Sequence, residues 1–293
     1  MKVMVLGGSG LVGYHIAKKL SDENAIVSTF NNNKIVANGC SSIKVNALDN
    51  ESIQNIISKY KPELIVDTIA FPNVDKCETD LEITSRINVE TTRIIVKECK
   101  NFNTKIIFIS TAFVFGNNEK IYTESDAPKP INNYGRQKLQ SEEIIEESGL
   151  PYLILRTDQI YGWSKIGQRQ SFVSNVLYKL KNDERIDVCI DWYNNPTYVD
   201  DISDCVDILV RKKKTGIYHV VGNSYINRYE WGIRIAKKFN HDEKLINAIY
   251  SKDLNLPAIR PNCNLSSVKI TNDTGFQMKS VDDGLDFMYR YGD

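Results

Sequence analysis

The sequence predicts an α/β fold in which a doubly wound parallel sheet is joined to a smaller C-terminal lobe. Three observations support this prediction. Short runs such as residues 2–6 and 64–67 are almost wholly apolar, which is typical of parallel strands buried on both faces. These runs alternate with helical patterns, and right-handed crossovers turn that alternation into a parallel sheet with helices on both sides. After residue 163 the alternation becomes irregular, which indicates a smaller second unit.

The first part of the chain contains six predicted strands, over residues 2–6, 25–30, 42–45, 64–67, 105–109 and 152–155. Helical patterns lie between them, through His15 and Leu20 and over residues 51–60, 81–100 and 133–147. Farther along we expect helices over 172–180, 199–210 and 231–239, and strands over 186–190 and 217–221. We therefore assign residues 1–162 to the sheet domain and residues 163–293 mainly to the smaller lobe, some of whose segments return to the sheet.

Composition limits the classes of function. The 293 residues carry a net charge of zero, which argues against a nucleic-acid partner because such a partner requires a basic surface. No apolar run reaches membrane-spanning length, and the chain starts with a predicted strand rather than a signal peptide, so we expect a cytoplasmic protein that does not bind membranes. The six cysteines show no CxxC spacing and the three histidines are dispersed, so we expect free thiols and no metal site.

The glycine cluster after the first strand predicts a dinucleotide-binding turn. Gly7, Gly10 and Gly13 are spaced GxxGxxG between a predicted strand and a predicted helix, which is the context that this motif requires. The helix start points N–H groups and the positive end of its dipole at the turn, where a pyrophosphate binds. Leu11 and Val12 belong to the same expected site. The alternative is a close strand–helix contact without a ligand.

The next strand indicates which dinucleotide binds. Sites specific for NAD place an acidic residue near the end of the second strand, and here Asn31 and its neighbours are neutral, with Lys34 following. We therefore expect NADPH, with NADH as the alternative. Further cofactor contacts are expected in the loops after the following strands, at Asn46, Ala47, Ala70 and Phe71.

Tyr134 and Lys138 predict acid–base chemistry on a carbonyl. Four residues apart on a helix, the two side chains face the same way. Hydride reduction of a carbonyl requires a proton at its oxygen, and a phenol with a pKa near 10 becomes a better donor beside an ammonium group. We therefore expect Lys138 to lower the pKa of Tyr134. The alternative is that these are two exposed side chains of a helix with no catalytic role.

The glycine turn, the Thr after residues 105–109 and the Tyr134/Lys138 pair together resemble the extended short-chain dehydrogenase/reductase superfamily, with an NAD(P)-binding Rossmann-type domain over residues 1–162. Other stretches are similar to its dTDP-4-dehydrorhamnose reductase branch, namely residues 74–76, 110–115, 134–139, 156–157, 196–197 and 260–261. The regulatory beta subunit of methionine adenosyltransferase belongs to the same branch, so the resemblance does not by itself imply a reductase.

The resemblance implies roles for particular residues. Counted back from Val114, it makes Thr111 rather than Ser110 the hydroxyl that orients the carbonyl, and it makes Lys138 a ligand of the nicotinamide ribose as well. Arg260 resembles a residue that contacts the substrate's phosphates, although a surface arginine is the alternative. Asn88 occupies a place where the superfamily often has Asn, either supporting a helix bend or relaying a proton.

Four positions depart from the branch and leave the substrate open. Thr-Asp-Tyr-Val-Phe is usual where this chain has Ala112 and Phe113, and Arg-Thr-Ser-Trp is usual where it has Asp158 and Gln159. We expect an NAD(P)H-dependent reductase of the 4-keto group of a nucleotide-linked 6-deoxy sugar. The alternatives are an epimerase or dehydratase on the same fold, a non-catalytic NADP-binding regulatory subunit, and a reductase of a smaller carbonyl compound. The sequence leaves the oligomeric state open, and a homodimer is one state that it allows.

Overall fold

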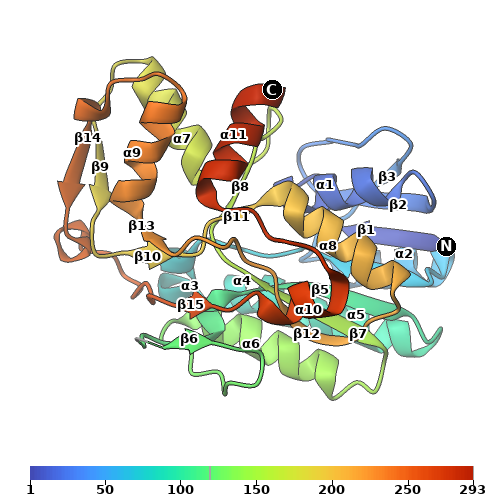
Figure 1. Cartoon of the computed structure of the whole chain (residues 1–293). Helices are drawn as coiled ribbons and strands as arrows, with labels where there is room; N and C mark the ends of the chain where they lie inside the picture. Colours follow the sequence, from blue (N-terminus) through green and yellow to red (C-terminus); the bar gives the residue numbers. More distant parts are fainter. Residues whose placement is uncertain (119, 293) are drawn as a thin grey trace.

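A seven-stranded parallel sheet forms the centre of the protein in the computed structural model, which describes residues 1–118 and 120–292 (Figure 1). Its strand order is β12-β7-β5-β4-β1-β2-β3, so the chain starts in the middle and winds outward in both directions. The strands are β1 (Lys2–Leu6), β2 (Ala25–Phe30), β3 (Ser41–Lys44), β4 (Leu64–Asp67), β5 (Lys105–Thr111), β7 (Tyr152–Thr157) and β12 (Gly216–His219). All six neighbouring pairs are parallel, which confirms the predicted doubly wound fold.

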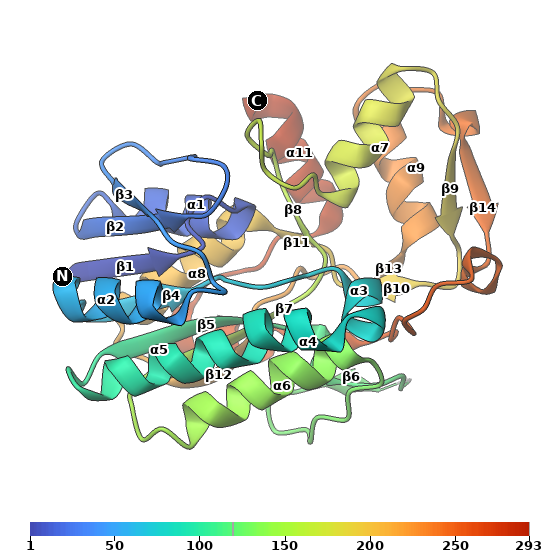
Figure 2. The ribbon, with the colours of Figure 1, turned by 180° about the vertical axis from the view of Figure 1, so that it is seen from behind.

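Helices cover both faces of this sheet because its strands are apolar on both sides. One face packs against α1 (Leu11–Leu20), α8 (Val199–Arg211) and α10 (Val268–Thr274), in a core to which β1 contributes Val3 and Val5 (Figure 1). The other face packs against α2 (Asn50–Tyr60), α5 (Thr91–Lys100) and α6 (Asn133–Glu146), with Met4 and Leu6 in the core (Figure 2). The period-two alternation of β1 thus supplies both cores.

The helix predicted over residues 81–100 is interrupted. The structure has α3 (Val74–Thr79), α4 (Leu81–Ser85), one turn of π-helix over Arg86–Glu90, and then α5. In the π-turn, the Asn88 side chain accepts a hydrogen bond from Phe71 N at 2.7 Å and donates one to Gln137 Oε1 at 2.7 Å. Asn88 therefore supports a helix irregularity by joining the loop after β4 to α6, as one of the two sequence interpretations expected.

The second half of the chain builds a smaller lobe and also returns to the sheet. In the lobe, α7 (Phe172–Lys181), α9 (Arg228–Lys238) and α11 (Val281–Tyr291) pack around Trp231, beside the parallel pair β9 (Ile186–Cys189) and β14 (Ile246–Ile249) (Figure 2). Strand β12 joins the main sheet beside β7. Neither α10 nor α11 was predicted from the sequence.

Three two-residue strand pairs connect distant segments. They are β6 (Ile121–Tyr122) with β15 (Asn264–Leu265), β8 (Ile160–Tyr161) with β11 (Thr197–Tyr198), and β10 (Tyr193–Asn194) with β13 (Ile226–Asn227). Single 3-10 turns cover Ala112–Val114, Glu243–Leu245 and Ser251–Leu254. Within the described residues, no helix has both the length and the apolar character to cross a membrane.

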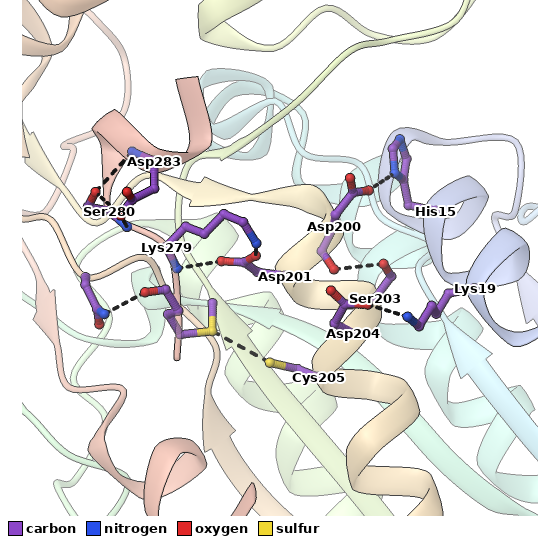
Figure 3. Close-up of polar contacts among 12 residues, drawn as sticks. His15, Lys19, Asp200, Asp201, Ser203, Asp204, Cys205, Lys279, Ser280 and Asp283 are labelled. Carbon is purple, nitrogen blue, oxygen red and sulfur yellow. Dashed lines mark hydrogen bonds and ion pairs between the residues drawn. The ribbon is translucent and has the colours of Figure 1, made fainter. Parts of the chain in front are cut away.

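Acidic residues in the first two turns of α8 tie this late helix to earlier and later parts of the chain (Figure 3). Asp200 pairs with His15 at 2.5 Å and Asp204 pairs with Lys19 at 2.7 Å, so both contacts reach α1. The buried Asp201 accepts from the backbone N–H of Lys279 at 2.7 Å, just before α11. Helix α8 thereby holds the helix that follows the glycine turn.

Candidate active site

A cavity of about 590 Å³ lies at the carboxyl ends of the central strands, between the sheet and the smaller lobe. Its lining includes residues from the ends of β5 and β7 and from the loops after β1 and β4, together with residues of the lobe. Ligands of doubly wound folds bind at this edge of the sheet, where the strand order reverses.

The glycine turn forms one wall of the cavity. Gly10 N donates to Gly7 O at 2.9 Å, and a Cβ on Gly13 would lie 2.5 Å from that same oxygen, so only glycine fits there. Helix α1 then starts at Leu11 without a side-chain cap and without an acidic residue in its first turn. Its N–H groups and positive dipole end are therefore available to an anion beside the turn.

The cavity contains some of the predicted cofactor residues and not others. The predicted cofactor residues that line it are Gly10, Leu11, Val12, Gly13, Ala70 and Tyr134. The predicted cofactor residues outside the lining are Gly7, Asn31, Asn46, Ala47, Phe71 and Lys138. Gly7 shapes the turn through its carbonyl, Ala47 O accepts from Thr91, and Phe71 is bound to Asn88, whereas Asn31 is exposed after β2.

A loop from the smaller lobe crosses to the glycine turn. We call residues 163–171, between β8 and α7, the strap. Gln168 Nε2 donates to Ser9 O at 3.0 Å, and Asn33 Nδ2 donates to Gly167 O at 2.7 Å. These contacts bring Arg169 to the cavity wall, in the same cavity as Tyr134. No motif marked Arg169, because a cation on an irregular loop has no characteristic spacing.

Thr111 and Tyr134 face the same cavity from different elements. Thr111 is the last residue of β5, and Tyr134 lies in the first turn of α6. A Cβ on Gly135 would lie 2.0 Å from Phe113 O, so the absence of a side chain there lets the helix approach the loop after β5. Ser110 also reaches the cavity, but its hydroxyl donates to the buried Glu142 at 2.5 Å. The geometry therefore favours Thr111 as the hydroxyl that is available to a ligand.

Lys138 is not placed as the sequence predicted. Its Nζ lies 3.7 Å from the ring centroid of Phe108, beneath the cavity, and it is not among the lining residues. Burial raises the pKa of Tyr134 above its usual value, and the opposing cation is Arg169. The expectation that Lys138 lowers the pKa of Tyr134 is thus wrong for this structure, because desolvation outweighs the charges around the phenol. A raised pKa keeps Tyr134 protonated near neutral pH.

The smaller lobe supplies two arginines that lie over the Trp192 ring. Arg228 Cζ lies 4.7 Å from the ring centroid and Arg260 Cζ lies 5.5 Å from it. Arg228 Nε donates to Asn194 Oδ1 at 2.9 Å, and its Nη2 donates to Gln159. Arg260 Nη2 pairs with Asp75 Oδ2 at 2.6 Å, from α3 of the sheet domain. Arg260 reaches the cavity as predicted, whereas Arg228 was missed because no spacing links it to its partners.

The two residues that depart from the branch after β7 also line the cavity. Asp158 is buried, and burial raises the pKa of its carboxyl to about 7, although it accepts a hydrogen bond from Asn195 N at 2.8 Å. Gln159 has a φ of 36°, which is unusual for a residue other than glycine. Of the earlier departures, Phe113 lines the cavity, whereas Ala112 is buried outside it.

Comparison with known proteins shows that most of the chain is similar to several reductases and to a methionine adenosyltransferase subunit. The chain is 28% identical to the dTDP-4-dehydrorhamnose reductase of Aggregatibacter actinomycetemcomitans, over 94% of each chain. It is 25% identical to a probable low-salt glycan biosynthesis reductase, Agl14, of Haloferax volcanii, over 97% of this chain and 96% of that one. It is also 28% identical to the methionine adenosyltransferase 2 subunit beta of Rattus norvegicus, over 82% of this chain and 72% of that one.

The fold has a close counterpart among solved structures. A dTDP-4-dehydrorhamnose reductase from Bacillus anthracis, in complex with NADP, superimposes with a TM-score of 0.87 at 24% identity, over 99% of each chain. The family model described as the RmlD substrate binding domain matches residues 1–291. On that match, which spans both the sheet and the smaller lobe, the chain belongs to the RmlD substrate binding domain family.

Proposed function

We propose that this protein is an NADPH-dependent reductase of the 4-keto group of a nucleotide-linked 6-deoxy sugar. The observation that carries the proposal is that Thr111 and Tyr134 share one cavity with the glycine turn and with the two arginines of the smaller lobe. One cavity therefore offers surfaces that complement a dinucleotide, a reacting carbonyl and a remote anionic group. The 28% identity to a dTDP-4-dehydrorhamnose reductase over 94% of each chain supports the same activity.

The residues present fit a dinucleotide. Gly13 leaves the space that a Cβ would fill, and the uncapped start of α1 leaves N–H donors beside the turn for a pyrophosphate. In this proposal NADPH supplies the hydride. The relative from Bacillus anthracis, in complex with NADP, supports this choice of cofactor.

The chain's own residues supply the proton and orient the substrate. The Thr111 hydroxyl orients the C4 carbonyl oxygen, and the Tyr134 hydroxyl donates its proton to that oxygen as hydride reaches the carbon. The product is an alcohol, and solvent restores the proton of Tyr134. Its raised pKa holds the phenol in the donor form that reduction requires. Ala112 and Phe113 add no acid or base, which disfavours a dehydratase.

The direct test is NADPH oxidation, followed by its absorbance, across a panel of nucleotide-linked 4-keto sugars and small carbonyl compounds. We expect turnover with a nucleotide sugar that carries a 4-keto group. Turnover with small carbonyl compounds alone would contradict the nucleotide part of the proposal. Turnover with none of the compounds would contradict the reductase itself.

A second candidate is a non-catalytic, NADP-binding regulatory subunit. Its support is the 28% identity to the methionine adenosyltransferase 2 subunit beta. The two candidates differ in one measurement, because a regulatory subunit binds NADPH without oxidising it in the presence of any sugar. NADPH binding without turnover on the panel would therefore place this candidate first.

The cofactor preference is testable by binding alone. NADPH should bind at least as tightly as NADH, because no carboxylate follows β2 and the exposed Lys34 offers a cation for a 2′-phosphate. Fluorescence titration of both nucleotides measures this, and Lys34→Gln should weaken NADPH without affecting NADH. A dissociation constant for NADH more than ~10-fold below that for NADPH, roughly 1.4 kcal/mol, would reverse the assignment.

Arg260 is the candidate contact for the substrate's diphosphate. Arg260→Ala should lower kcat/KM for a nucleotide sugar by about 10²-fold, since a hydrogen bond to a charged group contributes up to about 3 kcal/mol. NADPH affinity should stay unchanged, because Arg260 lies in the smaller lobe beside Trp192. Arg234→Ala is the matched control, since Arg234 is an exposed arginine of α9 that pairs with Asp282. Equal kinetics of the Arg260 variant and wild type would remove Arg260 from the substrate site.

A further inference from the structure

Asp67 places a buried carboxylate under the candidate active site. It is the last residue of β4, directly opposite Leu6 on β1 and Phe108 on β5 in the sheet register. Residues paired in this way point to the same face of a sheet. Leu6 and Phe108 both belong to the core beneath α5 and α6, so the Asp67 side chain enters that apolar core, where it is only 2% exposed.

The Lys138 ammonium enters the same core from α6. Its Nζ lies 3.7 Å from the ring centroid of Phe108, and the side chain is 1% exposed. Asp67 and Lys138 thus both lie beside Phe108, one as its neighbour in the sheet and the other over its ring. A buried ion is costly unless an opposite charge or hydrogen bonds compensate it.

The other groups near this pair compensate the charge of Lys138 less well than Asp67 does. Glu142, one turn farther along α6, accepts from the Arg156 Nε–H, which both of its oxygens share, from the Arg156 Nη2 and from the Ser110 hydroxyl. Cys99 on α5 belongs to the same core, but burial raises the pKa of its thiol to about 12, so it stays neutral. Tyr134 stays neutral too, because burial raises the pKa of its phenol, and the cation that opposes this rise is Arg169 rather than Lys138.

The Asp67 carboxylate, in contrast, has no cation within hydrogen-bonding distance among residues 1–118 and 120–292. It accepts one hydrogen bond, from Ile69 N at 3.0 Å. Its negative charge is therefore free to act on Lys138, which lies over the neighbouring Phe108 ring.

We propose that Asp67 is a positioning residue whose buried carboxylate keeps the Lys138 ammonium charged at the floor of the site. The consequence for catalysis rests on the proposed function and on the contact of Lys138 with the nicotinamide ribose that the family resemblance implies. The electrostatic pairing itself rests on the strand register, the ring contact and the burial of both groups.

The directions of the pKa shifts agree with this pairing. Burial lowers the pKa of Lys138 to about 8, and the charges of Asp67 and Glu142 act in the opposite direction. Burial raises the pKa of Asp67 to about 6, and the charge of Lys138 opposes that rise. Between those two values both groups are ionised, so the pair is intact near neutral pH. Without the Asp67 carboxylate, less negative charge opposes the effect of burial, so the pKa of Lys138 falls.

The test measures the titration of Lys138 directly. Protein labelled with ¹³C at the lysine ε-carbons is titrated without cofactor or substrate, and the Lys138 signal is identified by its loss in Lys138→Arg. Asp67→Asn keeps an oxygen that accepts from Ile69 N and removes the charge. We expect its Lys138 midpoint to fall by about one pH unit or more, as for loss of a nearby opposite charge.

A matched control and a second variant complete the test. Glu98→Gln removes another buried carboxylate from the same side of the sheet, on α5, where Glu98 accepts from Ser58 and Asn101, and it should leave the midpoint unchanged. Asp67→Ser removes the charge with a smaller side chain and should lower the midpoint as well. Melting temperatures verify that each variant is folded.

The outcomes are separable from those of the proposed function. An unchanged or higher Lys138 midpoint in both Asp67 variants would overturn the pairing, whether or not the enzyme turns over. If the Lys138 midpoint falls but the protein oxidises NADPH in the presence of none of the sugars tested, the pairing is upheld and the reductase is contradicted. In an active enzyme, the alkaline limit of NADPH binding should move to lower pH in Asp67→Asn and stay in place in Glu98→Gln.

Discussion

Replacing Tyr134 with phenylalanine should lower kcat by about 10²–10⁴-fold, the range typical of a general acid, while leaving NADPH affinity nearly unchanged. The hydroxyl acts only as the proton moves to the carbonyl oxygen, so its loss affects turnover rather than binding. The ring keeps its edge-to-face contact with Phe113, at 6.2 Å between centroids, and the fold should therefore be retained. Steady-state kinetics and NADPH titration measure the two effects separately.

Tyr152→Phe is the matched control, because Tyr152 lies at the start of β7, at the opposite end of the strand from the cavity, and its hydroxyl donates to Glu146. That variant should keep the wild-type kcat. A Tyr134 variant with most of the wild-type rate would show that another group donates the proton. Thr111 would then be the first residue to test, since its hydroxyl lines the same cavity.

Replacing Arg156 with methionine should lower the free energy of unfolding by about 3–5 kcal/mol, the cost of breaking a buried ion pair from one side. Arg156 on β7 and Glu142 on α6 are both at most 2% exposed, and the Arg156 Nη2 lies 2.7 Å from Glu142 Oε2. Among the described residues, the variant leaves the Glu142 carboxylate in the core with the Ser110 hydroxyl as its hydrogen-bond partner and without the arginine charge. Urea unfolding followed by circular dichroism measures the loss.

The double variant Arg156→Met/Glu142→Leu identifies the cause of that loss. Replacing both ions with apolar groups removes the unpaired charge, so the double variant should be more stable than Arg156→Met alone. Arg211→Met is the control, because Arg211 forms its ion pairs on the exposed surface, where such pairs contribute little, and it should leave stability nearly unchanged. A double variant that is less stable than Arg156→Met would mean that packing, not charge, determines the effect.

Much of the candidate site was predictable because the responsible signals are local in sequence. The strand–glycine–helix order from β1 to α1 is contained in 20 residues and needs no distant partner. The four-residue spacing of Tyr134 and Lys138 follows from helix geometry alone. The strands over residues 2–6, 25–30 and 64–67 are confirmed to the residue, since short apolar runs between turn signals have well-marked ends.

Local patterns did not predict the interruption of the helix over residues 81–100. The sequence there is helical by pattern, and the π-turn exists because Asn88 bonds the loop after β4 and a side chain of α6 at the same time. In the same way, the lysine predicted to act on Tyr134 lies over Phe108. Helical spacing determines the face of α6 on which Lys138 lies. The packing of α6 against β5 determines the position of the Lys138 ammonium group.

By itself the sequence determined the doubly wound sheet, the glycine turn and the residues that carry the proposed chemistry, because strand periodicity, turn chemistry and helix spacing act over a few residues. Only the tertiary structure decided which polar groups meet, as Arg260 does with Asp75 and Arg228 with Gln159, and it placed both Asp67 and Lys138 beside Phe108. These partners are 69 to 185 positions apart in the chain by their residue numbers. Their electrostatics depend on distance and burial, which arise only when the sheet and the lobe have packed together.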